Sequence, residues 1–249
     1  MNRSRRSAAR KEKRFKALLL TLIALVLVGF LAVILLENVF VLKNVVIEGS
    51  TSLTDNEIIR LGKFEFGGSI FSVNADRVRE NLESSGQIAV DDIAVQKPST
   101  VKLVVHERSR DALVLNGGRV LVLDSDGYVI DNPTTAPDSG IYVTGLEGTS
   151  YKIGRQITAP ANKLNAMKTV LEAIKAMNAT DYVTEVDLGD LMQITLITRT
   201  GITVQLGDTD NMNEKIRWMR SAVSDLESRG ERGGTLDVSS GTRADYLSD

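Results

Sequence analysis

Hydrophobic and polar residues follow one another in three different patterns along the chain, and each pattern predicts a different structure. Residues 17–36 are an apolar run without a charged side chain. Residues 44–110 combine short alternating segments, typical of strands, with two segments whose apolar residues are three or four positions apart, typical of helices. Residues 111–240 hold further alternating segments and two longer segments with helical spacing. We therefore expect an α+β protein with an N-terminal helix, a β-α-α-β-β domain and a β-rich domain with two flanking helices.

The apolar run at 17–36 is long enough to cross a membrane. As an α-helix it would rise about 30 Å, the thickness of the hydrocarbon core of a bilayer. A buried core helix is the alternative, but such helices are rarely apolar on every face over this length. The run is longer than the core of a signal peptide, and the residues after it do not form a small-residue cleavage site. The sequence therefore predicts a single, uncleaved transmembrane anchor.

The N-terminal tail, residues 1–16, is strongly basic, with eight Lys or Arg and one acid, Glu12. By the positive-inside rule the tail remains in the cytoplasm and residues 37–249 lie outside. We interpret the tail as a disordered determinant of topology that lies against anionic lipid, with a nucleic-acid-binding arm as the alternative. Of the chain's 30 basic and 32 acidic residues, 22 and 31 lie outside the tail, a net charge of −9. Because this charge repels nucleic acid, we expect no nucleic-acid partner.

Residues 44–110 read as a compact domain with the element order β-α-α-β-β. A strand at 44–49 is followed by a helix that begins after Thr54, where a Glu three residues on completes a capping-box pattern. A second helix begins after Asn74. A hairpin then occupies 90–107, with the turn at Lys-Pro-Ser-Thr.

Residues 111–249 read as a β-rich domain that ends in a polar tail. The expected elements, in chain order, are a strand-turn-strand at 119–131, a helix at 160–178, strands at 182–188, 191–199 and 202–207, a helix at 211–230, a final strand at 234–240 and a tail at 241–249. Since a polar tail follows the final strand, we expect that strand to be an edge of the sheet. On the last helix, Trp218 lies about 120° from the centre of the apolar stripe, where it is either a rim residue that packs on the sheet or an anchor for a partner.

The residue types in the chain exclude several kinds of site. There is no cysteine, which excludes disulfides, thiolate zinc sites and cysteine nucleophiles. His106 is the single histidine, so a site with several histidine ligands is excluded as well. The segment at 124–127, Asp-Ser-Asp-Gly, is similar to the start of a calcium loop, but position twelve is Thr135 and not a glutamate. We interpret it as a hairpin turn and expect no cofactor or metal.

Paired carboxylates are the remaining candidates for catalysis, because a wall hydrolase anchored to the membrane could use them as acid and base. The pairs are Glu107 with Asp111 and Asp187 with Asp190. Each pair lies beside an expected strand end or turn, where acids are common for structural reasons. Aromatic residues, which form the platforms of sugar-binding clefts, make up only 5% of the chain. We therefore expect no catalytic residues and keep the wall hydrolase as the alternative function.

The segment "VVHERSRDALV", residues 104–114, joins the two expected domains and is rich in ionisable groups. An active site would need a nucleophile near His106, and the sequence does not place one there. Glu107 and Arg108 are expected instead at the domain junction, as an ion pair or cap that fixes the angle between the domains.

The order of these segments resembles that of the bacterial cell-division proteins of the FtsQ/DivIB family. The family's POTRA domain is similar to "VLKNVVIEGSTSLTDNEII", "GGSIFSVNADRVRENL" and "VQKPSTVKLVVHERSRDALV". Its second domain is similar to "LVLDSDGYVI", "GITVQLGDTDNMNEKIRWM" and "GTLDVSS". The chain departs from the family at Arg110, where a proline is frequent, and at "SSGQIAVDD".

The resemblance implies a non-enzymatic scaffold of the division septum, held in the cytoplasmic membrane by a single span. Such a protein links coiled-coil partners of the FtsL and the FtsB or DivIC type and helps to recruit and regulate the septal peptidoglycan synthase. A secretion component with POTRA domains would instead carry tandem repeats or a barrel. The partner-binding residues implied by the resemblance are Leu236, Asp237, Val238 and Ser239 on the final strand, Tyr246 in the tail and Trp218 on the last helix. An edge strand suits this role, because its unpaired N–H and C=O groups can pair with a strand of the partner.

Overall fold

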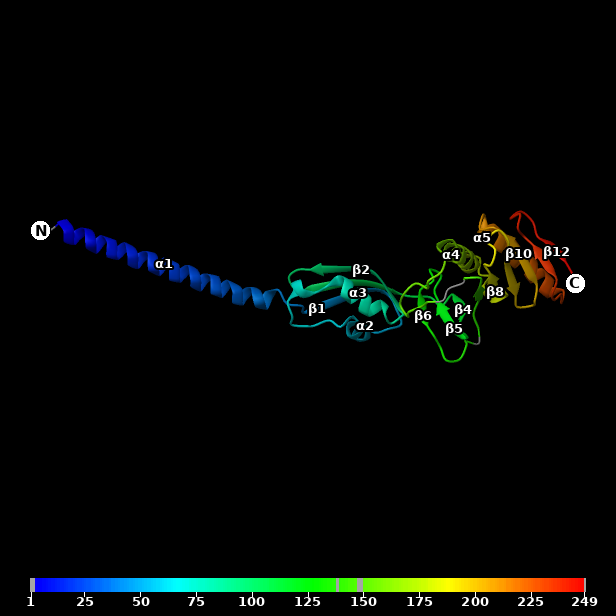
Figure 1. Cartoon of the computed structure of the whole chain (residues 1–249), viewed down its shortest axis with the longest axis horizontal. Coiled ribbons are helices and arrows are strands. Elements are labelled where there is room, and N and C mark those ends of the chain that lie inside the picture. Colours follow the sequence, from blue (N-terminus) through cyan, green and yellow to red (C-terminus); the bar gives the residue numbers. More distant parts are fainter. Residues whose placement is uncertain (1–2, 138, 147–149, 249) are drawn as a thin grey trace.

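The computed structural model describes residues 3–137, 139–146 and 150–248 as a long helix followed by two domains in line (Figure 1). Helix α1 spans Arg3–Val39, and it extends away from both domains. The tail that we expected to be disordered is therefore the first part of this helix. The side chains of residues 1–15 lie outside the described part of the chain, and with them all but one of the basic groups of the tail.

The predicted membrane anchor is described only in part. The side chains of residues 17, 35 and 36 lie outside the description, and those of 18–34 are exposed. Among the residues that are described, no helix combines the length and the apolar character needed to cross a membrane.

The first domain has the predicted order β-α-α-β-β. Its elements are β1 (Asn44–Ser50), α2 (Asp55–Gly62), the 3-10 turn η1 (Ile70–Ser72), α3 (Ala75–Glu83), β2 (Ile88–Gln96) and β3 (Thr100–Glu107). The sheet order is β1-β3-β2, with β1 parallel and β2 antiparallel to the central β3. Both predicted caps are present: the side chain of Thr54 accepts from the N–H of Glu57 in a capping box, and Asn74 accepts from the N–H of Arg77.

The core of the first domain forms where the apolar faces of its two helices meet the sheet. Ile58 of α2 and Val78 and Leu82 of α3 are buried against Leu103 and Val105 of the central strand. The two strand residues are two positions apart, so both point to the helix-covered face.

The second domain contains a single nine-stranded sheet. Its elements are β4 (Ala112–Asn116), β5 (Arg119–Leu123), β6 (Val129–Asp131), β7 (Tyr142–Thr144), α4 (Ala161–Ala176), the 3-10 turn η2 (Thr180–Tyr182), β8 (Val183–Asp187), β9 (Ile194–Thr198), β10 (Thr203–Gly207), α5 (Met212–Ser228), β11 (Thr235–Asp237) and β12 (Asp245–Leu247). The sheet order is β12-β11-β10-β9-β8-β7-β4-β5-β6. The sheet therefore begins near the first domain at β6 and ends at the C-terminus with β12 (Figure 1).

The two helices of this domain bury the stripes that the sequence predicts. Met167, Leu171 and Ile174 of α4 and Ile216 and Met219 of α5 are all fully buried in one core with the sheet. The Asp-Ser-Asp-Gly segment is the turn between β5 and β6, where the N–H of Gly127 donates to the carbonyl of Asp124 at 3.0 Å. Gly127 has a φ of 80°, a conformation that favours glycine.

Candidate partner-binding site

The edge of the sheet is one strand further along the chain than the sequence predicts. The tail that we expected after the final strand forms β12, which pairs antiparallel with β11. The partners are Thr235 with Leu247, Leu236 with Tyr246, and Asp237 with Asp245. The prediction that the strand around Leu236 is the open edge is therefore wrong, because β12 covers it. The tail gave little signal for a strand, since Tyr246 and Leu247 are its only large apolar residues.

The residues predicted on the final strand divide into buried and accessible ones. Leu236 and Val238 are fully buried in the core, so their side chains support the edge from inside. The N–H of Val238 donates to the carbonyl of Gln205 at 3.1 Å, within the sheet. The substitution Val238→Pro would therefore break an internal bond and not a partner contact. Ser239 is exposed and lies beyond the end of β11.

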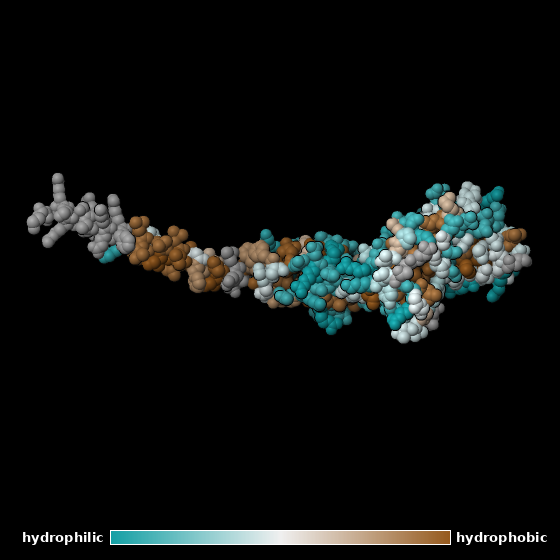
Figure 2. Space-filling view, viewed as in Figure 1, coloured by the Kyte–Doolittle hydropathy of each residue, from teal (hydrophilic) through white to brown (hydrophobic). Residues whose placement is uncertain are grey.

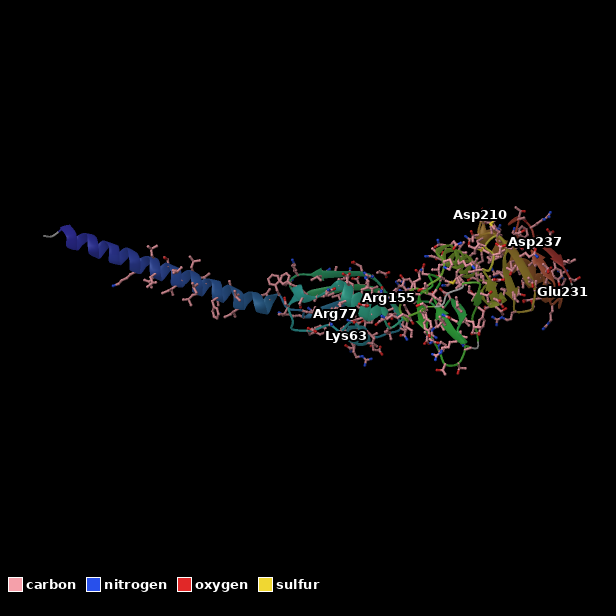
Figure 3. The ribbon with its side chains drawn as sticks, viewed as in Figure 1. Lys63, Arg77, Arg155, Asp210, Glu231 and Asp237 are labelled. Atoms are coloured by element: carbon pink, nitrogen blue, oxygen red, sulfur yellow. The ribbon has the colours of Figure 1, made fainter. Side chains whose placement is uncertain are left out.

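Asp237 is held by a local hydrogen-bonded turn at the end of β11. Its carboxylate accepts the N–H of Ser239 at 2.8 Å. Hydrogen bonds from the side chain and backbone of Ser239 keep the pKa of the Asp237 carboxyl below its usual value. Figure 3 shows Asp237 at the end of the molecule distant from α1. Asp237 is half-buried beside the edge, and its carboxylate already has a partner.

The direction of the backbone groups along β11 shows which groups of β12 face outward. The N–H of Thr203 donates to the carbonyl of Gly234, and the N–H of Val238 donates to Gln205, so alternate residues from 234 to 238 point toward β10. The residues between them therefore point toward β12. Tyr246 is opposite Leu236, whose backbone groups point toward β10. The N–H and C=O of Tyr246 are therefore directed away from β11. In the described sheet, β12 has a neighbouring strand on one side only.

The side chains of β12 alternate between the core and the solvent. Tyr246 packs against the core, and its hydroxyl donates to the carbonyl of Gly233 at 3.1 Å. Leu247 points to the other face and is 74% exposed. A side chain at Gly234 would meet the carbonyl of Leu247 at 2.6 Å, so the close approach of β12 requires a glycine there.

Trp218 lies on α5, and its side chain is 37% exposed. The start of α5 is near the turn that leads into β12, because Gly241 lies close to the side chains of Asn211 and Lys215. The structure thus places the predicted residues on β11 and just after it, on β12 and on α5, and it makes β12 the edge strand at this end of the sheet.

At the domain junction, Arg108 and Glu107 are not partners of each other. Glu107 accepts the N–H and the hydroxyl of Ser52, at 2.7 and 3.0 Å, within the first domain. The guanidinium of Arg108 pairs with the carboxylate of Asp124 at 2.6 Å, and the two side chains are 7% and 8% exposed. Arg108 also lies over the ring of Tyr128, 3.9 Å from its centroid.

The pair of Arg108 and Asp124 links the two domains. The N–H of Arg108 donates to the carbonyl of Gln87 in the first domain at 2.8 Å, while Asp124 belongs to the second domain. Burial raises the pKa of the Asp124 carboxyl, although hydrogen bonds from the Tyr128 N–H and from Arg108 act in the opposite direction. With the guanidinium at hydrogen-bond distance, we take the pair as ionised at neutral pH.

Three further contacts across this junction could not be predicted from the sequence. A side chain at Gly154 would lie 1.9 Å from the carbonyl oxygen of Glu83, and one at Gly86 would lie 2.2 Å from that of Ile130. The two domain backbones are thus in direct contact at these glycines. Arg155 pairs with Glu80 of α3 at 2.9 Å, and Figure 3 shows Arg155 at the boundary between the domains.

The acids considered for catalysis have local structural partners. Asp111 binds Lys175 at 2.8 Å and the N–H of Ser125 at 3.0 Å, while Glu107 caps Ser52. Asp187 and Asp190 each accept an N–H two residues further along the chain. His106 pairs with Asp91 at 2.9 Å, and both are about half exposed. Within the described ranges, no cluster of three or more His, Asp or Glu residues could hold a metal ion.

These observations define a class of protein: a POTRA-like domain joined through backbone contacts and a buried ion pair to a β-rich domain whose sheet ends in an accessible edge strand. Residues 40–108 match the family described as "POTRA domain, FtsQ-type", and residues 112–239 match "Cell division protein FtsQ/DivIB, C-terminal". The chain belongs to the FtsQ/DivIB family of cell-division proteins.

Individual relatives agree with the family. The chain is 23% identical over 206 residues to the cell division protein DivIB of Clostridium acetobutylicum, with 80% of each chain covered. It is 24% identical to DivIB of Clostridium tetani, over 80% of this chain and 76% of the relative. It is 25% identical to the cell division protein FtsQ of Anaeromyxobacter sp. (strain K), over 80% of this chain and 68% of the relative.

Proposed function

We propose that the chain is a non-enzymatic, single-span scaffold of the division septum. In this proposal residues 17–36 cross the cytoplasmic membrane, with the N-terminus in the cytoplasm and both domains outside. The scaffold links coiled-coil proteins of the FtsL and FtsB/DivIC types and helps to recruit and regulate septal peptidoglycan synthesis. Membership of a cell-division family supports the septal role, and the charge-free run supports the anchor.

The observation that carries the proposal is the outward-facing backbone of Tyr246 on β12. A strand of the partner that lies beside β12 would find one free N–H and one free C=O at this residue. Backbone pairing of this kind supplies affinity, and alternate side chains supply specificity. Leu247 is the exposed apolar side chain of β12 that such a strand would partly cover. The partner site therefore lies on β12, with Leu236 and Val238 beneath it as support.

A pair of substitutions at Tyr246 tests this site. Tyr246→Pro removes the outward N–H, whereas Tyr246→Ala removes the same phenol side chain and keeps that N–H. Loss of one interstrand hydrogen bond of about 0.5–1.5 kcal/mol weakens binding by roughly 2- to 12-fold. We expect Tyr246→Pro to bind an FtsB/DivIC-type partner at least that much more weakly than Tyr246→Ala. The affinity is measured by titration of the full chain in detergent.

Two controls make the comparison specific. Asp245→Pro would remove a bond between β12 and β11, so it should lower the stability of the edge as well as binding. Denaturation followed by fluorescence of Trp218, the single tryptophan, shows whether each variant is folded. If Tyr246→Pro and Tyr246→Ala are both folded and bind the partner equally well, the β12 site is wrong.

A further inference from the structure

The end of the POTRA domain that adjoins α1 carries exposed aromatic rings. We call this end the tip and define it as residues 40–43, 66–71 and 97–99. Phe66 is 50% exposed and Phe71 is 63% exposed. The ring of Phe71 lies 5.4 Å from that of Phe40, which directly follows the end of α1. Figure 2 shows hydrophobic surface at the end of the domain next to α1. Grouped apolar side chains on a surface are typical of an interaction site.

The tip is a fixed structure and is built onto the end of α1 by backbone hydrogen bonds. The N–H of Ile70 donates to the carbonyl of Phe40 at 3.0 Å. Leu42 and the glycine loop exchange two bonds, from Leu42 to Gly68 and from Gly67 to Leu42, both 2.9 Å long. The N–H of Lys43 donates to Ser99 at 2.9 Å, which attaches the third segment. The rings are therefore held at a defined distance from the apolar helix.

The charge of the tip is positive. Lys43 and Lys97 are both exposed, and the three segments contain no acidic residue; Glu65 is the neighbour just outside them. The ammonium of Lys97 lies 5.2 Å from the centroid of the Phe71 ring. Aromatic rings beside lysines suit the boundary of an anionic membrane, where the rings lie in the interfacial layer and the ammonium groups meet lipid phosphates.

The position of the tip along the chain also places it at the boundary of the membrane. If residues 17–36 fill the hydrocarbon core, Phe40 is four residues beyond it, or about 6 Å at the rise of an α-helix. The headgroup region on each side of the core is about 5–8 Å thick. Phe40 and its neighbour Phe71 therefore lie at the level of the outer headgroups.

We propose that the tip docks into the outer interfacial layer of an anionic membrane, with Phe66 and Phe71 inserted and Lys43 and Lys97 at lipid phosphates. This inference rests on the membrane anchor of the proposed function. The docking fixes how the POTRA domain stands on the membrane, which a single helix alone would leave free to tilt.

The absence of cysteine allows a direct test, because one introduced cysteine can carry an environment-sensitive dye without competition. Ser72→Cys places the dye on an exposed residue beside Phe71 and leaves both rings in place. Leu25→Cys places it in the apolar run, and Met192→Cys places it on an exposed residue of the second domain. The full chain is reconstituted in vesicles of phosphatidylethanolamine and phosphatidylglycerol, without a quencher or with a lipid that carries one either near its headgroup or on its acyl chain.

We expect the acyl-chain quencher to act at Leu25→Cys, the headgroup quencher to act at Ser72→Cys, and neither to act at Met192→Cys. Adding Phe66→Asp and Phe71→Asp to Ser72→Cys should reduce its quenching to the level of Met192→Cys while Leu25→Cys stays quenched. A quenched Leu25→Cys with an unquenched Ser72→Cys overturns the inference and leaves the anchor intact. An unquenched Leu25→Cys overturns the anchor and the inference together. If Ser72→Cys is quenched equally with and without Phe66→Asp and Phe71→Asp, insertion of the rings is overturned.

Discussion

The buried pair of Arg108 and Asp124 allows a quantitative prediction about the domain junction. Asp124→Asn removes the negative charge but keeps an oxygen that can accept the N–H of Tyr128, which donates to the Asp124 carboxylate at 2.8 Å. The guanidinium of Arg108 then remains buried, at 7% exposure, without a counter-ion. Loss of one partner of a buried ion pair costs about 3–5 kcal/mol. Since Asn still hydrogen-bonds, we expect the lower end, about 3 kcal/mol.

The double variant separates the ion pair from the rest of the site. Arg108→Met keeps much of the packing over Tyr128 and removes the positive charge, and alone it leaves the Asp124 carboxylate unpaired. When both charges are absent, neither is buried without a counter-ion. The double variant should therefore lose less free energy of unfolding than the two single variants together, by at least about 1.5 kcal/mol.

The assay is urea denaturation of the chain at neutral pH, followed by the fluorescence of Trp218 in the second domain. If the losses of free energy of unfolding add up in the double variant, Arg108 and Asp124 are not coupled. A loss below about 1 kcal/mol for Asp124→Asn would refute the claim that Arg108 depends on this carboxylate.

One other prediction concerns the same junction. Gly154→Ala forces a methyl group against the carbonyl of Glu83 and should separate the domains. The separation should be seen as faster proteolysis near residues 108–111. Gly117→Ala is the control, because Gly117 also has a positive φ and has open space around it.

Local patterns in the sequence predicted the helices well. The caps at Thr54 and Asn74 and the buried stripe through Met167 and Ile174 depend on residues within a few positions of one another. Such signals survive in a single sequence because each element must satisfy its own backbone ends and bury its own face.

Long-range pairing could not be predicted in the same way. Strand β12 has three residues, and its place is decided by pairing with β11 and by the absence of a side chain at Gly234. Arg108 pairs with Asp124, sixteen residues away in the sequence, although the acidic residue next to it in the sequence is Glu107. The sequence identified Asp124 only as a turn residue, and its second role depends on how the first domain meets that turn.

The nine-stranded sheet has a mechanical consequence. It connects the domain junction at β6 to the outer edge at β12, so tension applied by a partner on β12 passes through every ladder of the sheet in series (Figure 1). The ladder between β11 and β12 has three registered residue pairs, whereas the one between β5 and β6 has two and the one between β4 and β7 has one. Under a pull across the strands, the ladder between β4 and β7 would open first if backbone pairing alone held it, so the buried side chains that pack β4, β7 and α4 into one core carry the load from β12 to the junction.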